Sequence, residues 1–285
     1  MIYALIPVFN RLELTKRCIA SIKAQSKKER IEIIVVDDGS TDGTSQWLSS
    51  SREITVLQGS GSLFWCGAVH YGIEYCLRIS KKGDYLLLLN NDVELASNTV
   101  ELLEEFLSNR KKTAIASAVT VDIRDRDTII KTGSIVKNWY LNKTYHVYTG
   151  TKQSNIDKNL PVCVDFLTAR CLLHPIEVFW QAGNYDSRTF KHYGGDDEFS
   201  IRVKKFGIET FLIPSATVYM KQELFSKLSF LEVLFSIRSS SNIINKFKLS
   251  LVIAPNTAKF SFFLCGILKS LLFALINELR KNSKH

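Results

Sequence analysis

Proline and glycine are scarce in this chain of 285 residues, which contains five prolines and 14 glycines. That scarcity argues against a disordered or collagen-like protein. Hydrophobic residues make up 46% of the sequence. The chain can therefore bury a sizeable core, and its length suits one large domain or one domain with an extension.

Paired cysteines are also missing. None of the six cysteines forms a Cys-x-x-Cys pair, and no Cys/His spacing supports a zinc site. We therefore expect buried free thiols in a reducing compartment rather than a disulfide framework. The N-terminus has no basic leader and no long apolar run, so it does not look like a secretory signal, and we expect a cytoplasmic protein.

Two phosphate-binding motifs are absent as well. No Walker sequence Gly-x-x-x-x-Gly-Lys-[Ser/Thr] occurs, and the loop Gly59-Ser-Gly61 is followed by Phe64 where a dinucleotide fingerprint needs a third glycine. The adjacent Phe64 and Trp65 are unusual for a loop. They would either wall a sugar or base site or pack in the core.

The net charge of +9 is unevenly distributed along the chain. Residues 221–285 hold ten basic and three acidic residues, whereas the first 220 residues hold 27 and 25. A basic tail rich in Phe and Leu indicates an anionic membrane surface at least as readily as nucleic acid. The apolar run 260–276 has Lys269 in its middle, so we expect a helix lying in the membrane plane or packed on the protein or a partner, rather than a spanning helix.

What the sequence does contain is an alternation of apolar strands and helical patterns. Leu86–Leu89 is a short apolar run typical of a strand buried on both faces. Further strands are predicted at 2–8, 32–36, 53–57, 114–119 and 210–218. The alternation predicts an α/β fold with a mostly parallel central sheet flanked by helices.

Three other segments complete the expected organisation. Residues 121–162 predict an irregular, partly antiparallel insertion, and Pro175 is expected to open a helix at its first turn. The tail from about residue 223 predicts two or three helices with a break at Pro255. We therefore divide the chain into a domain at 1–220 and a basic, apolar helical extension at 221–285.

Three acidic groups follow the predicted elements: Asp37 and Asp38, then Asp92, then the run from Asp196 to Glu198. Each group alone could be a turn or a helix cap. Ligands of open α/β sheets bind beyond the carboxyl ends of the strands. Together the groups could serve a nucleoside diphosphate, with one contact to base and ribose, one to a cation, and one base for an attacking hydroxyl.

Four segments closely resemble the family 2 glycosyltransferases of the GT-A fold, across about residues 2–220. The segments are Ile6-Pro-Val-Phe-Asn10, Val35-Val-Asp-Asp-Gly-Ser-Thr-Asp-Gly-Thr44, Leu89-Asn-Asn-Asp92 and Gly195-Asp-Asp-Glu-Phe-Ser-Ile-Arg202. The aromatic segment at Leu63-Phe-Trp65 and the His192-Tyr-x-x-Asp-x-Glu segment resemble bacterial polysaccharide transferases of the rhamnosyltransferase-like kind.

The resemblance implies a donor site for a nucleotide-diphospho-sugar. Its positions here would be Pro7, Val8, Phe9, Asp38, Trp65, Asn90 and Asn91. Asp38 would accept a hydrogen bond from the base, beside the pocket lined by the segment 7–9. Asp92 would bind the family's divalent cation, Mg²⁺ or Mn²⁺, against the diphosphate.

The resemblance also implies the reacting side of the site. Asp196 would be the general base, while Glu198 and Arg202 would shape the acceptor and diphosphate side. Two departures stand out: Asn90 replaces the first Asp of the family's Asp-x-Asp element, and Gly195 replaces the Glu of its Glu-Asp pair. The segment 218–222 also lacks the histidine that often completes the metal site, and Lys221 could assist the phosphates instead.

The sequence thus predicts an inverting glycosyltransferase of bacterial surface polysaccharide synthesis. We expect its acceptor to be a saccharide linked to a lipid. We expect it in the cytoplasm, peripherally on the inner membrane, and not on nucleic acid. Two alternatives stay open. One is a non-catalytic component with the same fold, because of Asn90 and Gly195. The other is a sugar-nucleotide pyrophosphorylase, although Asn10–Glu13 lacks the glycine-rich basic loop that such an enzyme needs.

Overall fold

The computed structural model describes residues 1–221 and 228–282. Its strands are β1 (Ile2–Val8), β2 (Ile31–Asp37), β3 (Ile54–Gln58), β4 (Tyr85–Leu89), β5 (Glu94–Leu95), β6 (Ala114–Asp122), β7 (Ile129–Lys131), β8 (Ser134–Asn138), β9 (Lys143–His146), β10 (Val162–Cys163), β11 (Cys171–Pro175) and β12 (Glu209–Met220). Its helices are α1 (Leu12–Lys23), α2 (Thr44–Ser49), α3 (Phe64–Ile79), α4 (Thr99–Ser108), α5 (Glu177–Ala182), α6 (Gly195–Lys205), α7 (Phe230–Phe235), α8 (Ile243–Ile253) and α9 (Lys259–Asn282), with short 3₁₀ turns at Lys28–Arg30 and Gln153–Asn155.

The central sheet is mostly parallel, as the alternation of strands and helices predicts. In the described residues its strands follow the order β10-β12-β6-β11-β4-β1-β2-β3, with β5 beside β12 and β7 beside β6. The neighbours β3, β2, β1 and β4 all run parallel, and so do β6 and β12. In the middle of the sheet, β11 lies between β4 and β6 and pairs antiparallel with both.

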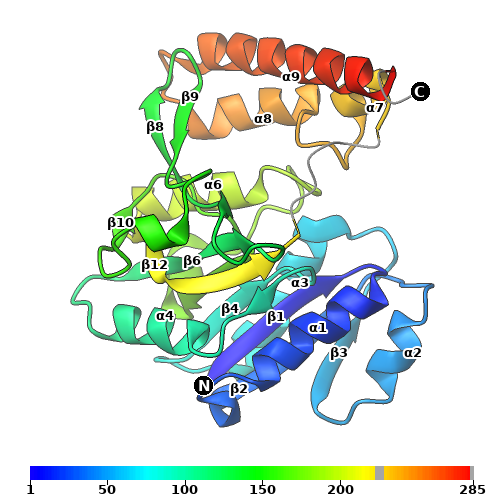
Figure 1. The fold of residues 1–285 in the computed structure, drawn as a ribbon, viewed down its shortest axis with the longest axis vertical. Coiled ribbons are helices and arrows are strands. Elements are labelled where there is room, and N and C mark those ends of the chain that lie inside the picture. Colours follow the sequence, from blue (N-terminus) through cyan, green and yellow to red (C-terminus); the bar gives the residue numbers. More distant parts are fainter. Residues whose placement is uncertain (222–227, 283–285) are drawn as a thin grey trace.

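The sheet separates two hydrophobic cores (Figure 1). Alternate residues of β1 point to opposite faces, so Ile6 joins the core beneath α1 and α4 while Leu5 joins the core beneath α3 and α6. The four leucines Leu86–Leu89 are fully buried between these two layers. A strand covered on both faces has no polar side, which explains the unbroken apolar run in the sequence.

The segment 121–162 forms the expected irregular, partly antiparallel insertion. β7 pairs antiparallel with β6, and β8 pairs antiparallel with β9 as a separate hairpin. In Figure 1 this hairpin rises from the sheet toward the C-terminal helices. It contacts them through Tyr140, whose hydroxyl donates to Thr257 Oγ1 at 3.0 Å.

The C-terminal part forms a helical layer with its break where the sequence predicts it. α8 ends at Ile253 and α9 begins at Lys259, on either side of Pro255. Figure 1 places α8 above α6 and α9 outermost. Residues 222–227, where the predicted tail helices would begin, lie outside the described part. The division near residue 220 stays a prediction, because Leu249 and Phe262 also join the core beneath α3 and α6.

Two expectations are wrong in detail. Pro175 ends strand β11, and α5 begins only at Glu177. Pro175 pairs with Tyr85 at the edge of the ladder, where a missing N–H is tolerated. Phe64 and Trp65 are not loop residues but start α3. Phe64 has a φ of 56°, so the chain turns sharply at this point before it becomes helical.

The packing of α3 on β1 depends on Gly72. A Cβ atom at this position would clash with Leu5 Cδ1 and would lie 3.0 Å from Val36 Cγ2. We predict that Gly72→Ala lowers the free energy of unfolding by about 1–3 kcal/mol through overpacking, although alanine is the better helix former. Arg78→Ala, on the exposed side of the same helix, is the control and should change stability by less than about 0.5 kcal/mol. Urea titration measures both. Equal effects would contradict this account of the packing.

Candidate active site

The loops that follow β1 and β2 meet at the carboxyl edge of the sheet. The Asn10 backbone N–H donates to Ser40 Oγ, and Asn10 Oδ1 accepts from the Thr41 N–H, each at 2.7 Å. The predicted base-lining residues lie here: Pro7 and Val8 are buried, while Phe9 is 42% exposed. Phe9 is therefore the member of this trio that offers a ring to a ligand.

Asp38 holds the adjacent loop in place. Its Oδ1 accepts from the Gly61 N–H at 2.8 Å and its Oδ2 from the Phe64 N–H at 3.0 Å. A Cβ atom at Gly59 would lie 2.7 Å from Asp38 Oδ1, so the loop passes too close for any other residue. A carboxylate has further lone pairs, and the contact of Asp38 with a base stays a prediction.

The tip of β4 is tied to both neighbouring elements. Trp65 Nε1 donates to Asn90 Oδ1 at 3.0 Å, and Asn91 Nδ2 donates to Thr15 Oγ1 at 3.0 Å. The aromatic segment predicted to wall the site therefore does contact the Asn90 position, through a hydrogen bond rather than by stacking. Both asparagines hold the turn in place, which leaves Asp92 as the carboxylate of this segment.

Asp92 has one paired and one unpaired oxygen. Its Oδ2 lies 3.2 Å from Arg11 Nη1, whereas its Oδ1 is buried without a hydrogen-bond partner. Arg11 and the preceding Asn10 both have positive φ, 67° and 61°. Two consecutive residues in this sparsely populated region mark local strain, which is concentrated at functional sites in proteins.

The unpaired oxygen of Asp92 fits a metal ligand. Within residues 1–221 and 228–282 no cluster of three or more His, Cys, Asp or Glu side chains could hold a metal ion. Mg²⁺ needs no such cluster, because it is commonly bound by one or two carboxylates together with substrate phosphates and water. The segment 218–222 offers Lys221 but no histidine, and Gln222 lies outside the described residues.

A second acidic group lies at the first turn of α6. Burial raises the pKa of the Asp196 carboxyl, and the charges of Lys131 and Arg170 oppose that rise. Burial and the charge of Asp196 raise the pKa of the adjacent Asp197 to about 7. Burial therefore favours protonation of both carboxylates, a property that suits a group that takes up a proton during a reaction.

Glu198 and Arg202 are engaged with each other. Arg202 Nε and Nη2 donate to the two Glu198 carboxylate oxygens at 2.7 and 2.9 Å. The guanidinium also donates to the backbone carbonyl oxygens of Ala182 and Asn184. This bidentate pair fixes α6 against the segment after α5. The expected contact of Glu198 and Arg202 with acceptor or diphosphate stays a prediction.

The glycine at position 195 has a steric cause. A Cβ atom there would lie 2.8 Å from Cys66 Sγ. Cys66 belongs to α3, and its N–H donates to the Lys191 carbonyl oxygen at 2.9 Å. The first turns of α3 and α6 therefore meet at the site, and the space for the family's glutamate is filled from α3.

Arg170 links the two acidic groups, and our sequence analysis did not single it out. Burial lowers the pKa of its guanidinium, while the charges of Asp92 and Asp196 both oppose this effect. Its Nε donates to Met220 Sδ at 3.4 Å, at the end of β12. A signal was present in the sequence: Arg170 is the one charged residue in the apolar run 166–173.

The C-terminal part reaches the same edge of the sheet. The Arg238 guanidinium lies 5.3 Å from the centre of the Phe9 ring. Its charge and that of Arg11 add to burial in lowering the pKa of His192 to about 4. His192 is thus neutral near pH 7, and its Nδ1 is buried without a partner. Arg11, His192 and Arg238, which are absent from our predicted site, therefore lie near Phe9 and Asp92 or interact with one another.

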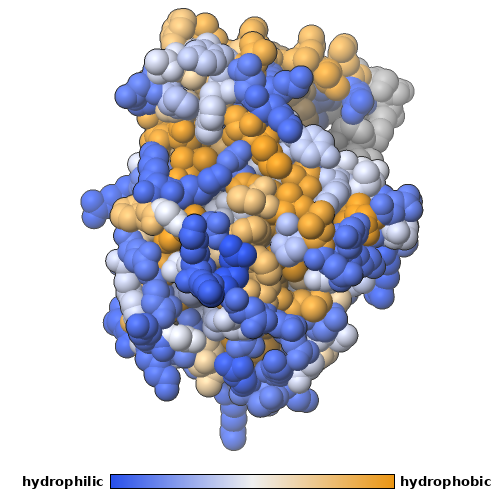
Figure 2. Space-filling view, turned by 90° about the vertical axis from the view of Figure 1, so that its left-hand side faces the viewer, coloured by the Kyte–Doolittle hydropathy of each residue, from blue (hydrophilic) through white to orange (hydrophobic). Residues whose placement is uncertain are grey.

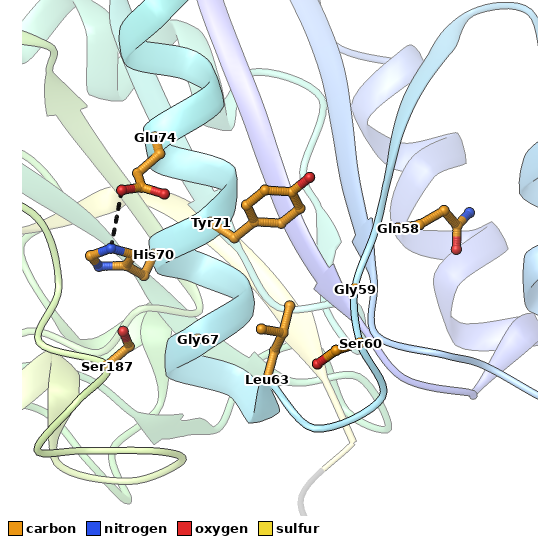
Figure 3. A pocket seen from close by; sticks show the side chains of 9 residues that line it. All are labelled: Gln58, Gly59, Ser60, Leu63, Gly67, His70, Tyr71, Glu74 and Ser187. Atoms are coloured by element: carbon orange, nitrogen blue, oxygen red, sulfur yellow. Dashed lines mark ion pairs between the residues drawn. The ribbon is translucent and has the colours of Figure 1, made fainter.

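A separate cavity of about 330 Å³ is bordered by Gly59, Ser60 and Leu63 of the loop after β3 (Figure 3). It includes His70 and Tyr71 of α3 together with Ser187. His70 Nε2 lies 3.4 Å from Glu74 Oε1 at its rim. No residue of the predicted donor or acceptor site lines this cavity.

The sequence matches the family model described as "Glycosyl transferase family 2" over residues 3–171, more than half of the chain. No curated protein matches the chain significantly. The match spans β1 to the start of β11, and so includes Asp38, Asp92 and Arg170. It ends before Asp196.

Solved structures share this fold. The structure of GalNAc-T7 with UDP, GalNAc and Mn²⁺ has a TM-score of 0.63 at 17% identity, with 79% of this chain and 43% of that one covered. S. aureus TarS 1–349 with UDP has a TM-score of 0.56 at 14% identity, with 97% and 73% covered. The same protein with UDP-GlcNAc gives 0.55 at 13% identity, with 88% and 71% covered. The chain spans less than half of the GalNAc-T7 structure. The fold is GT-A, as predicted.

The contact between α3 and α6 yields a testable coupling. We predict that Gly195→Ala lowers the free energy of unfolding by about 1–3 kcal/mol, because its Cβ would meet Cys66 Sγ at 2.8 Å. Cys66→Ala removes that sulfur and leaves a Cβ 3.7 Å away, so the double variant should recover most of the loss. Urea denaturation of all four proteins measures the coupling. Simple additivity would show that the glycine has another cause.

Proposed function

Because the chain belongs to glycosyl transferase family 2, we propose that it transfers a sugar from a nucleotide-diphosphate donor to a hydroxyl group of a saccharide acceptor. The main support is the family match, which covers Asp38 and Asp92, and the charges of Asp92 and Asp196 both act on the Arg170 guanidinium. Carboxylate, cation and base are the groups that this chemistry requires.

The donor would bind across the carboxyl ends of β1, β2 and β4. Phe9 offers its ring to the base beside Asp38, and the diphosphate would lie between Asp92 and Arg170. Structural neighbours hold UDP or UDP-GlcNAc, which supports a uridine nucleotide here. A phosphate near Arg170 and Arg11 would gain charge-assisted hydrogen bonds of the kind that arginine forms best.

Asp92 would hold a divalent cation, Mg²⁺ or Mn²⁺, through its unpaired Oδ1. The Mn²⁺ in the GalNAc-T7 structure supports the use of such an ion. When bound, the ion would supply Lewis-acid stabilisation of the departing diphosphate. Arg11 holds Asp92 Oδ2 and so would keep Oδ1 turned toward the ligand.

The reaction would be a single in-line displacement with inversion. Asp196 takes the proton from the acceptor hydroxyl as the acceptor oxygen bonds to the anomeric carbon. The bond from that carbon to the diphosphate oxygen breaks, and the nucleoside diphosphate leaves with the electron pair. The charges of Lys131 and Arg170 oppose the rise that burial gives the pKa of Asp196, and so favour the ionised form that a general base needs.

The acceptor would be a lipid-linked saccharide of bacterial surface polysaccharide synthesis. The aromatic segment at 63–65 and the His192-Tyr segment support a rhamnosyltransferase-like specificity, in which the sugar is a deoxyhexose. The alternative function is a non-catalytic component that keeps the fold, and the residues Asn90 and Gly195 favour it. Turnover of a nucleotide-sugar distinguishes the two.

The base assignment is tested at two adjacent carboxylates. We predict that Asp196→Asn lowers kcat for sugar transfer by about 100- to 10,000-fold, the usual contribution of a general base, with little change in UDP affinity. Asp197→Asn is the matched control and should lose less than about tenfold. Release of UDP from a panel of UDP- and dTDP-sugars measures both. If only the Asp197 variant were inactive, the general base would be Asp197, and our assignment of Asp196 would be wrong.

The metal assignment has an equally close control. Asp92→Asn should abolish the gain in UDP affinity that Mn²⁺ gives the unmodified protein, because the unpaired oxygen is lost. Glu94→Gln changes an acidic side chain with the same 27% exposure, paired with Arg17 instead, and should keep the gain. Isothermal titration with and without Mn²⁺ reads out the difference. A persistent metal effect in the Asp92 variant would place the ion elsewhere.

A further inference from the structure

Helix α9 has its apolar side turned outward. Along the helix, exposed large residues recur every three or four positions. They are Phe260, Leu264, Leu268, Leu271, Leu272, Leu275 and Leu279, with exposed fractions from 38% to 74%. We call this row the outer stripe. Spacing of this kind places all of its members on one face of a helix, and a helix folded in water would bury that face.

Beyond Phe262, which joins the core at the start of α9, the buried positions of this helix are small or polar. Ser270 is 2% exposed, Ala274 is fully buried and Asn277 is 3% exposed. Asn277 Nδ2 donates to the Leu228 carbonyl oxygen at 3.0 Å. At Gly266 the helix lies close to α8, because a Cβ atom added at this glycine would lie 3.7 Å from Lys246 Cβ. The inverted pattern follows from specific packing on α8 and α7, so turning the helix over would break these contacts.

The neighbouring helices continue the apolar surface. Leu231 and Phe235 of α7 are 66% and 55% exposed, and Ile244 and Leu251 of α8 are 53% and 46% exposed. Figure 2 shows hydrophobic residues gathered at the top of the molecule, where α9 lies, whereas the opposite end is mostly hydrophilic. Contiguous exposed apolar surface of this extent marks an interaction site.

Charge points to the occupant of this surface. Between residues 228 and 282 the sequence has seven basic and two acidic residues. Lys259 and Arg280 stand at the two ends of the outer stripe. An apolar face bordered by basic residues complements a bilayer surface that carries anionic lipids. A second copy of the chain would present the same positive charge, which opposes self-association at low ionic strength.

The contacts of α9 hold this helix against α8 and the β8–β9 hairpin. It is the one segment of the described residues, Lys259–Arg280, that is long and apolar enough to cross a bilayer. Yet Asn142 of the β8–β9 hairpin donates through Nδ2 to the Phe262 carbonyl oxygen at 3.3 Å, and Lys269 Nζ donates to the Asn142 carbonyl oxygen. Crossing the bilayer would require these bonds and the packing on α8 to break.

We infer that the outer stripe, with the exposed apolar residues of α7 and α8, docks in the plane of an anionic bilayer. Docking would orient the molecule as well as anchor it. α8 lies between α9 and the first turn of α6: a Cβ at Gly194 would be 3.5 Å from Leu249 Cδ1, and Lys248 Nζ donates to the Thr189 carbonyl oxygen at 3.0 Å. The Asp196 end of α6 is thereby held near the bilayer. This orientation does not depend on which reaction the protein catalyses.

Vesicle flotation of the full chain tests this inference. The unmodified protein should float with vesicles of phosphatidylcholine and phosphatidylglycerol and much less with phosphatidylcholine alone. Leu268→Glu/Leu272→Glu changes residues that are 65% and 57% exposed, and should lower the partition coefficient by about tenfold or more. Leu160→Glu/Phe206→Glu, at 58% and 55% exposure outside the stripe, should float as the unmodified protein does.

Four further measurements distinguish docking from unfolding, loss of donor binding, membrane spanning and self-association. Both double variants should keep the melting temperature and the UDP affinity of the unmodified protein, so that a loss of flotation reflects the surface alone. Alkaline carbonate should release the docked protein, and retention would indicate a spanning helix. Equal flotation of the two double variants would overturn the inference. The inference would also be overturned if the unmodified protein bound no vesicles and sedimented as a dimer, and if only Leu268→Glu/Leu272→Glu dissociated that dimer.

Discussion

The parallel pairing of β2, β1 and β4 is the constraint on which the site depends. Because all three strands run in one direction, the segments after Val8, Asp37 and Leu89 must emerge at the same edge of the sheet. Burial on both faces fixes the register, since a slip by one residue would exchange the two cores. Residues as distant in sequence as Asn10 and Asn91 are brought to one place without any need for mutual attraction.

Around that edge the chain uses most polar groups to hold its own loops. Asp38, Asn90 and Asn91 bond to backbone or side chains, and Glu198 with Arg202 fixes α6. Among the described residues, Asp92 Oδ1 and His192 Nδ1 are buried here without a hydrogen-bond partner. A rigid frame with a small number of unpaired atoms is the arrangement expected of a binding site organised before its ligand arrives.

The strands, the edge of the sheet where the polar segments gather, and the break at Pro255 could be predicted from the sequence, because each follows from a local pattern. The residues 64–65 and 175 were assigned wrongly because tertiary contacts decided them: Trp65 bonds to Asn90 and Pro175 pairs with Tyr85. Gly195 looked like a lost catalytic position, and only the packing of Cys66 explains it. Arg170 and Arg238 were missed because their roles arise from contacts between different segments of the chain: Arg170 with Asp92 and Asp196, and Arg238 with Phe9.

The central claim is that one cleft at the carboxyl edge holds the donor between Asp92 and Arg170, within reach of Asp196. A crystal structure with UDP and Mn²⁺ tests it most directly, because the anomalous signal of the ion locates the metal independently of the nucleotide. The account predicts the ion on Asp92 Oδ1 and the diphosphate between Asp92 and Arg170. A nucleotide bound instead in the cavity beside His70 and Tyr71, with no ion at Asp92, would contradict it.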